Sequence, residues 1–152
     1  MPRVADLIAA RKRGDLPQQS TSVASVQPET TVLDAAKAMN EAHVGSLVVL
    51  DGNGGLLGIF TERDVLRRVV AKSLDPEQTA VGDVMTKNVH TAPPETPLDD
   101  LRTLMREKHI RHVPIVADGK LAGMISIGDL NAAEAKTLVE TITYLERYMT
   151  VT

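Results

Sequence analysis

The sequence predicts an α/β (α+β) fold in which one strand–helix–strand–strand–helix unit occurs twice in tandem. The chain of 152 residues resembles itself: when residues 28–50 are shifted forward by 66 positions, seven aligned pairs are identical. Residues 56–65 align with residues 121–130 at a shift of 65, with three further identities. The difference of one residue lies in a Gly-rich segment, where a hairpin turn tolerates a change of length. The chain is therefore expected to be an internal duplication.

Each copy is predicted to contain the same elements in the same order. A short strand comes first, and an amphipathic helix follows it, because leucine and methionine recur three, six and seven positions after Leu98. Two short apolar strands joined by a Gly-containing turn come next, and a second helix begins at Thr61 or Ser126. The expected ranges are strand 22–26, helix 32–42 and strands 47–50 and 56–60 in the first copy, and strand 88–91, helix 98–108 and strands 113–116 and 121–125 in the second.

Two further helices are expected outside the duplicated units. Residues 4–13 form the first, and the second continues from Ser126 to about Met149 with a stripe of leucine, isoleucine and methionine. The second helix is longer than the small unit needs, so its outer turns are expected to pack on another subunit or on the N-terminal helix. The expected divisions are an N-terminal helix and linker at 1–19, repeats at 20–72 and 86–131, a connector at 73–85 and a C-terminal helix extension at 132–152.

Composition excludes several function classes. The absence of Cys excludes disulfide scaffolds, thiolate nucleophiles and Cys-ligated metal centres. A net charge of −3 and three aromatic residues argue against a nucleic-acid-binding accessory protein. No apolar run approaches the roughly 20 residues that span a bilayer, and the N-terminus lacks the hydrophobic region of a secretory signal. A cytoplasmic protein with neither a membrane nor a nucleic acid as partner is expected.

The chemically most informative residues are Thr61 and Asp64, which recur as Ser126 and Asp129 in the second copy. Residues three apart share one face of the first helical turn, where free N–H groups favour phosphate. A hydroxyl there can bond to a phosphate oxygen, and a carboxylate can accept both hydroxyls of a ribose. The same pattern is also a capping box, in which the acid bonds to the first amide of its own helix. Because the pattern occurs twice in register, we favour the nucleotide contact.

The duplicated pattern resembles a pair of cystathionine-β-synthase-type (CBS) domains, the arrangement called a Bateman module. The resemblance covers about residues 20–131 and rests on four segments, residues 58–64, 123–129, 110–116 and 81–86. It implies tandem CBS repeats related by pseudo-two-fold symmetry in a stand-alone signal-transduction protein. Such a protein is expected to form a homodimer, to bind an adenine nucleotide (AMP, ADP, ATP or NAD) as a regulatory ligand, and to report it to an unidentified protein target without catalysis.

The resemblance also implies where the ligand lies, namely between the paired sheets and in contact with both repeats. Asp64 and Asp129 would hold the ribose hydroxyls. The phosphate or the polar rim of the cleft would be contacted by Thr61, Ser126, Arg63, Arg111 and His112. The base pocket would be shaped by Pro114 and by the strand entry at residues 86–89, including Thr86 and Val89.

The two clefts are not expected to be chemically equivalent. Gly128 stands in the second copy where the first has Arg63, and Gly45 stands in the first where the second has Arg111. Which arginine serves which cleft is left open by the sequence. Arg67 and Arg68 are expected to belong to a solvated helix face.

The main alternative to nucleotide sensing is a structural dimerisation or protein-interaction module whose clefts hold no nucleotide. A metal site is a separate question, raised by His109 and His112, which are three residues apart. No Cys accompanies them, and His43 and His109 fall at the ends of equivalent helices, so no metal is expected. Because no serine has the context of a nucleophile, an enzyme is not expected either.

Overall fold

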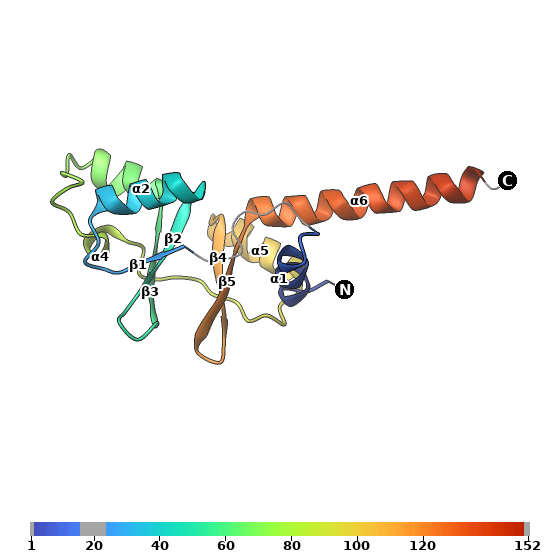
Figure 1. The fold of residues 1–152 in the computed structure, drawn as a ribbon, viewed down its shortest axis with the longest axis horizontal. Coiled ribbons are helices and arrows are strands. Elements are labelled where there is room, and N and C mark those ends of the chain that lie inside the picture. The colour runs from blue at the N-terminus through green and yellow to red at the C-terminus, as the bar shows by residue number, and fades with distance from the viewer. Residues whose placement is uncertain (1, 16–23, 151–152) are drawn as a thin grey trace.

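The computed structural model describes residues 2–15 and 24–150, and it confirms a mixed α/β fold built from two tandem units (Figure 1). The chain begins with a helix that precedes the first unit, and it ends with a long helix that projects away from the second. The elements in chain order are α1 (Val4–Lys12), β1 (Ser25–Val26), α2 (Val32–Ala42), β2 (Ser46–Leu50), β3 (Leu56–Thr61), α3 (Glu62–Asp64) with its π-helical continuation η1 (Val65–Val70), α4 (Val81–Val84), α5 (Leu98–Lys108), β4 (His112–Ala117), β5 (Lys120–Ser126) and α6 (Ile127–Thr150).

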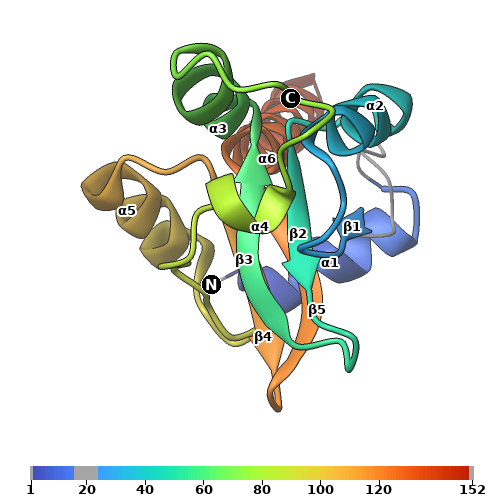
Figure 2. The ribbon, with the colours of Figure 1, turned by 90° about the vertical axis from the view of Figure 1, so that its left-hand side faces the viewer.

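The two hairpins at the centre of the units are equivalent. β2 pairs with β3 and β4 pairs with β5, both antiparallel, and each ladder has an irregularity at the same point of the repeat. The last pairs of the two ladders are Ser46 with Thr61 and His112 with Ser126. Each second strand therefore ends on the hydroxyl residue of the repeated motif. Figure 2 shows the β2–β3 hairpin lying in front of the β4–β5 hairpin, with both turns at the same end.

The expected strand at residues 88–91 is wrong. In the first unit, β1 runs parallel to β2, and the Val48 N–H donates to the Ala24 carbonyl over 3.1 Å. The corresponding residue of the second unit is Pro114, which has no N–H to donate. Only a single parallel bridge between Ala92 and Ile115 remains there. A proline in the receiving strand thus reduces the second ladder to one residue pair.

Each unit has its own apolar core, and α1 belongs to the core of the second. Val4 and Leu7 are buried with residues of α5, β4 and β5. The Val4 N–H also donates to the Thr96 carbonyl over 2.9 Å. The core of the first unit is assembled from α2, β2, β3, η1 and the connector; its buried members are Val32, Ala35, Met39, Leu47, Val49, Phe60, Val69, Val81, Val84 and Met85.

The helices α2 and α5 end in the same way in the two units. α2 ends at His43 and α5 ends at His109, with backbone φ angles of 55° and 54°. This left-handed conformation lets the backbone N–H groups of both residues bond to carbonyls of the last turn. The expectation that the two histidines occupy equivalent helix ends is confirmed.

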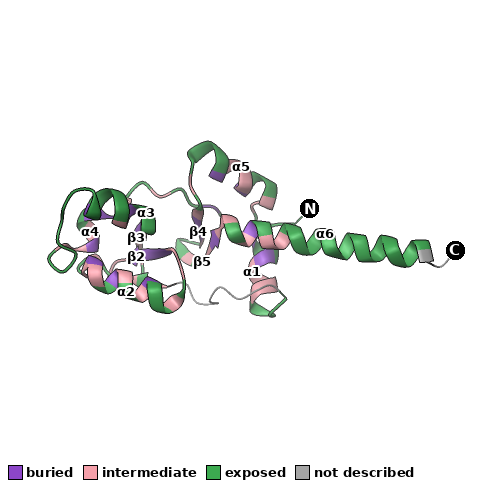
Figure 3. Ribbon diagram, turned by 90° about the horizontal axis from the view of Figure 1, so that it is seen from above, coloured by how far each residue is buried: buried purple, intermediate pink, exposed green. Residues whose placement is uncertain are grey.

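α6 is partly buried in its first turns and exposed in its later turns. Its first turns pack on the second unit, where Leu130 is buried, and the Lys136 Nζ donates to the Asp15 carbonyl of the segment after α1 over 2.9 Å. Beyond this point the helix is exposed on all sides (Figure 3). Among the described residues, no helix is long and apolar enough to cross a membrane.

Candidate functional site

The first motif forms a capping box at the junction of β3 and α3. The Asp64 N–H donates to the Thr61 Oγ1 over 3.3 Å, and the Thr61 N–H donates to the Asp64 Oδ2 over 3.0 Å. The Asp64 residue is only 5% exposed. The local geometry is therefore that of the capping interpretation, and any ligand contact by Asp64 must be compatible with it.

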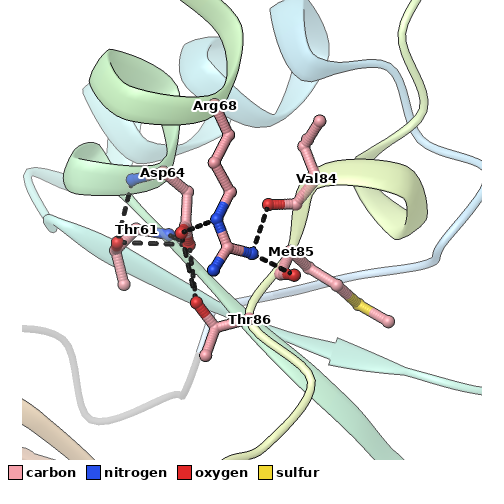
Figure 4. Close-up of polar contacts among 6 residues, drawn as sticks. All are labelled: Thr61, Asp64, Arg68, Val84, Met85 and Thr86. Carbon is pink, nitrogen blue, oxygen red and sulfur yellow. Dashed lines mark hydrogen bonds and ion pairs between the residues drawn. The ribbon is translucent and has the colours of Figure 1, made fainter.

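Asp64 also ties the motif to the connector between the units (Figure 4). The Thr86 Oγ1 donates to its Oδ1 over 3.1 Å, and the Arg68 Nε lies 3.6 Å from the same oxygen. The Arg68 Nη1 donates to the carbonyls of Val84 and Met85 over 3.3 and 2.7 Å. The expectation that Arg68 is a merely solvated side chain is wrong, because its guanidinium links the motif helix to the connector.

A close backbone approach brings Thr86 to the motif. The Ile59 N–H donates to the Thr86 carbonyl over 3.0 Å, and the Thr86 N–H donates back to the Ile59 carbonyl over 2.9 Å. A Cβ atom at Gly58 would lie 2.6 Å from the Thr86 carbonyl oxygen, so only glycine leaves room for this bridge. The connector thereby reaches the edge of β3 and places the Thr86 hydroxyl against Asp64.

A cleft of about 380 Å³ opens beside the motif, and residues of both units line it. The first unit supplies its motif and three arginines, and the second supplies the segment that enters β4. Across the cleft, the Arg63 Nη1 donates to the His109 carbonyl over 3.3 Å. The lining residues are Gly45, Ile59, Thr61, Glu62, Arg63, Asp64, Arg67, Arg68, Thr86, Ile110, Arg111 and His112. Six residues named from the sequence are thus brought together: Thr61, Arg63, Asp64, Thr86, Arg111 and His112.

The cleft is rich in cationic side chains. Four arginines line it, against the two carboxylates of Glu62 and Asp64. His112 is partly buried, and burial lowers the pKa of its imidazole from the ordinary value of 6.5. The carboxylates of Asp129 and Glu62 oppose this shift in pKa, and Arg111 adds to it. The arrangement suits an anionic ligand with phosphate groups, which would be attracted by the arginines.

The second motif is built in the same way but has a different neighbour. The Ser126 N–H donates to the Asp129 Oδ2 over 2.7 Å, and the Asp129 N–H donates to the Ser126 Oγ over 3.1 Å. Arg11 of α1 lies 3.8 Å from the same carboxylate and donates to the Met124 carbonyl over 3.0 Å. The side chains of Arg11 and Asp129 are 15% and 10% exposed. α1 therefore supplies a largely buried cation to the second carboxylate.

Four residues named from the sequence lie apart from the cleft. Ser126 and Asp129 form the second motif, beside α1. Pro114 is buried in β4 opposite Met124, and Val89 lies in the irregular segment after the connector. None of these four lines the cleft.

The contacts of Arg68 with Asp64 and of Arg11 with Asp129 were not predicted from the sequence. Arg68 follows Asp64 by four residues, a spacing at which helical side chains meet, so a signal was present in the sequence. Arg11 precedes Asp129 by more than a hundred residues, and no local pattern links the two. In the part of the chain that the structure describes, no three His, Asp or Glu side chains are grouped as a metal site would require.

Comparison with known proteins places this geometry in context. Residues 14–71 and 81–136 match the CBS domain family. The CBS domain-containing protein YhcV of Bacillus subtilis is 37% identical over 111 residues, which are 73% of this chain and 78% of YhcV. The mitochondrial CBSX3 of Arabidopsis thaliana is 38% identical over 125 residues, which are 80% of this chain and 61% of that protein. The chain therefore spans less than two thirds of this plant relative.

Solved structures agree with the sequence matches. The CBS-domain protein from Burkholderia ambifaria superposes with a TM-score of 0.79 at 36% identity, covering 87% of this chain and 93% of its own. The CBS domain pair of MJ0100, solved with 5′-methylthioadenosine and S-adenosyl-L-methionine, has a TM-score of 0.74 at 23% identity. That match covers 90% of this chain and 98% of the domain-pair chain in that structure, and at such identity it shows a shared fold.

Proposed function

Because the chain belongs to the CBS-domain family and contains two CBS domains, we propose that it is a regulatory module that binds an adenine nucleotide and signals its presence to a protein target. The observation that carries the proposal is the cleft between the two repeats. It has a volume of about 380 Å³, within the range of roughly 300–1,000 Å³ typical of ligand pockets. Its cationic lining suits phosphate groups, and its buried carboxylate suits a ribose.

In this proposal, different residues of the cleft bind different parts of the nucleotide. Arg63 and Arg111 approach from opposite repeats and bind the phosphates, with His112 beside them. Thr61 completes the phosphate site through its hydroxyl. Asp64 accepts the ribose hydroxyls in place of the Thr86 hydroxyl, whose contacts with the two carboxylate oxygens are 3.1 and 3.4 Å long. A ribose O–H is a donor of the same kind, so this exchange leaves the carboxylate satisfied.

The base is assigned to the apolar part of the cleft. Ile59 and Ile110 line it, and no Phe, Tyr or Trp does. Aliphatic side chains and backbone groups therefore hold the adenine in this proposal. The adenosine ligands bound by the CBS pair of MJ0100 support the compatibility of the fold with such a molecule.

The second motif is proposed to be closed to nucleotides in this chain. A ribose would have to compete for Asp129 with the guanidinium of Arg11, which is mostly buried and held by the Met124 carbonyl. Arg68 is the counterpart in the first repeat, but it is 49% exposed and lines the open cleft. We therefore assign one nucleotide to each chain.

The remaining parts of the proposal follow from the family rather than from the cleft. We assign the protein no catalytic activity and no resident metal, and we place it in the cytoplasm as a homodimer. The nucleotide would act by changing the relative angle of the two repeats or the dimer contact, a population shift that requires different affinities for the two states.

A structural module without a nucleotide is the second candidate function. It is favoured by one observation, namely that both carboxylate oxygens of Asp64 already accept hydrogen bonds within the protein. In that case the cationic cleft would face solvent or a protein target, and the motif would be a helix cap alone.

Thermal unfolding with a nucleotide panel separates the two candidates. The panel is AMP, ADP, ATP, NAD and S-adenosylmethionine, each added to the whole chain at millimolar concentration. A ligand at 100 times its Kd stabilises the folded state by about 2.7 kcal/mol, which raises the Tm of a chain this long by roughly 5–11 °C. If none of the five compounds raises the Tm, the nucleotide proposal is wrong and the structural module is favoured.

A matched pair of arginine variants locates the effect. Arg111→Ala removes a cation that lines the cleft, whereas Arg106→Ala removes an exposed cation near the end of α5 that does not. We expect Arg111→Ala to reduce the affinity for the effective nucleotide by about tenfold, because a hydrogen bond to a charged group contributes about 1.5–3 kcal/mol and Arg111 is exposed. Arg106→Ala should bind like the wild type. Equal losses in both variants would mean that the nucleotide lies elsewhere.

A further inference from the structure

A second pocket adjoins the cleft on the side of α2. It has a volume of about 580 Å³ and is lined by residues of the C-terminal half of α2 and of the motif helix. Figure 2 shows α2 and α3 at the end of the β2–β3 hairpin that lies opposite its turn. Gly45 and Glu62 line both this α2 pocket and the cleft. The two spaces therefore meet at these two residues.

Glu62 lies at the boundary between the α2 pocket and the cleft. Its backbone N–H donates to the Gly45 carbonyl over 3.0 Å, and its carboxyl group lies 3.2–3.4 Å from the position that a Cβ atom on Gly45 would take. Since Gly45 has no side chain, the only side chain that both spaces share is that of Glu62. Within the described part of the chain, the Glu62 carboxylate accepts no hydrogen bond and forms no ion pair. It is therefore available to a ligand that passes from one space into the other.

The α2 pocket differs from the cleft in charge. Four arginines line the cleft, whereas the pocket has one lysine, Lys37, against the carboxylate of Glu62. The C-terminal end of α2 also lies at the pocket, because its last residue, His43, is part of the lining. This end of a helix carries partial negative charge. Phosphate groups are therefore attracted to the cleft rather than to the α2 pocket.

The lining of the α2 pocket suits a polar ring with an attached sugar. Met39, Val44 and Val65 supply its apolar part, and Asn40 and Glu62 are polar residues with exposed side chains. The amide of an asparagine offers both donors and an acceptor to a heterocycle, and a carboxylate can accept both hydroxyls of a ribose. A mostly apolar lining with a few polar groups is typical of ligand pockets of roughly 300–1,000 Å³.

We infer that the ligand of this protein is a dinucleotide, in which two nucleosides are joined through their phosphates. The inference rests on the proposed function, which places the adenosine and the phosphates in the cleft. The second nucleoside passes Glu62 and lies in the α2 pocket, with its ring against Val44 and Val65 and its ribose hydroxyls on the Glu62 carboxylate. NAD belongs to this class of ligand, whereas AMP, ADP and ATP have no group that would occupy the pocket.

Calorimetric titration of the whole chain with NAD and with ADP tests this inference. The two compounds share an adenosine and a diphosphate, but ADP carries the larger negative charge, so the arginines of the cleft alone would favour ADP. We expect NAD to bind about tenfold more tightly than ADP, because its second nucleoside adds hydrogen bonds and apolar contacts.

Two variants of the α2 pocket and one matched control locate the preference. Asn40→Ala should lower the affinity for NAD by about threefold to tenfold and leave the affinity for ADP unchanged. Glu62→Ala should also weaken NAD binding, but it should not weaken ADP binding, because it removes a negative charge near the phosphates. Arg106→Ala changes the residue of α5 that corresponds to Asn40 in the repeat, is exposed and lines neither space, so both affinities should stay at the wild-type value.

The possible outcomes separate this inference from the proposed function. A preference for NAD that is lost in either pocket variant and kept in Arg106→Ala supports the dinucleotide. If ADP binds as tightly as NAD, or if both pocket variants keep the full preference for NAD, the dinucleotide inference is overturned while the nucleotide-binding function stands. If neither compound nor any other nucleotide of the panel binds, both proposals are wrong.

Discussion

His112 lies at the junction of the two repeats, and charged groups of both repeats affect its pKa. It lines the cleft with Arg111, while Glu62 of the first repeat and Asp129 of the second lie close enough to affect its protonation. Burial has the largest effect and lowers its pKa, so the folded protein favours the neutral imidazole. The further charged groups that line the same cleft are Arg63, Asp64, Arg67 and Arg68.

The lowered pKa of His112 predicts opposite effects of acid on folding and on binding. Because the folded pKa lies below the ordinary value of 6.5, the unfolded chain takes up the proton first, and the free energy of unfolding decreases as the pH falls below that value. A bound phosphate favours the imidazolium and raises its pKa, so nucleotide affinity should increase as the pH falls from 7.5 to 6.0. Calorimetric titrations at the two pH values measure this change.

His112→Gln is the control for this pH dependence. It removes the titrating group and keeps a polar side chain, so only the titration of the phosphate itself should remain. If the variant shows the same increase in affinity as the wild type, His112 does not contact the ligand, and the protonation change belongs to another group.

At the scale of elements, the two equivalent glycines of the repeats have different neighbours. Gly58 of β3 faces the backbone of Thr86, whereas Gly123 of β5 faces the Ile8 side chain of α1. A Cβ at Gly58 would meet a carbonyl oxygen at 2.6 Å, but at Gly123 it would meet the flexible end of Ile8 at 3.3 Å. The same substitution therefore strains the backbone in one repeat and a single side chain in the other.

We expect Gly58→Ala to lower the free energy of unfolding by about 1–3 kcal/mol, the usual range for overpacking. Gly123→Ala should lower it by less than about 1 kcal/mol, because the Ile8 side chain can move. Each kcal/mol corresponds to about 2–4 °C in Tm for a chain of this size, so thermal unfolding of the two variants decides the question. Equal Tm values would contradict the proposed role of Gly58 in holding the connector against β3.

Most of the elements could be predicted from local patterns, but the strand at 88–91 was wrong and the short helix α4 in the connector was not expected. The helices expected at 32–42 and 98–108 agree with α2 and α5, because their apolar spacing and helix ends are encoded within a dozen residues. The strand expected at 88–91 fails because its pairing depends on a partner residue, Pro114, that cannot donate a hydrogen bond. Aligning the two repeats predicts a strand in the second unit because the first unit has one. The alignment does not consider whether the neighbouring strand can donate the hydrogen bond that the pairing needs.

The parts of the candidate site that depend on residues close in the sequence could be predicted. The contacts between residues far apart in the sequence could not. The spacing predicts Thr61 and Asp64, and the resemblance to CBS pairs adds Thr86 from the strand entry at residues 86–89. The placement of α1 on the second repeat was not predictable, because its apolar residues Val4 and Leu7 could have packed on any exposed core. The contact of Arg11 with Asp129 follows from that packing alone.

At the scale of the whole molecule, the two repeats share their central hairpins and capping boxes, but the surroundings of the two motifs differ. Both motifs are capping boxes at the same point of the repeat. The first opens onto a cleft lined by both repeats, and the second is covered by a helix from the start of the chain. This asymmetry is the basis of our proposal that each chain has one regulatory site, formed at the first motif.

The stoichiometry of nucleotide binding tests this picture most directly. Calorimetric titration of the whole chain should use the nucleotide that gives the largest Tm shift, with Asp64→Asn and Asp129→Asn as matched variants whose Tm confirms that they are folded. We expect one nucleotide per chain, a loss of about tenfold or more in affinity for Asp64→Asn, and wild-type affinity for Asp129→Asn. Two nucleotides per chain, or a loss confined to Asp129→Asn, would contradict the assignment of the ligand to the cleft between the repeats.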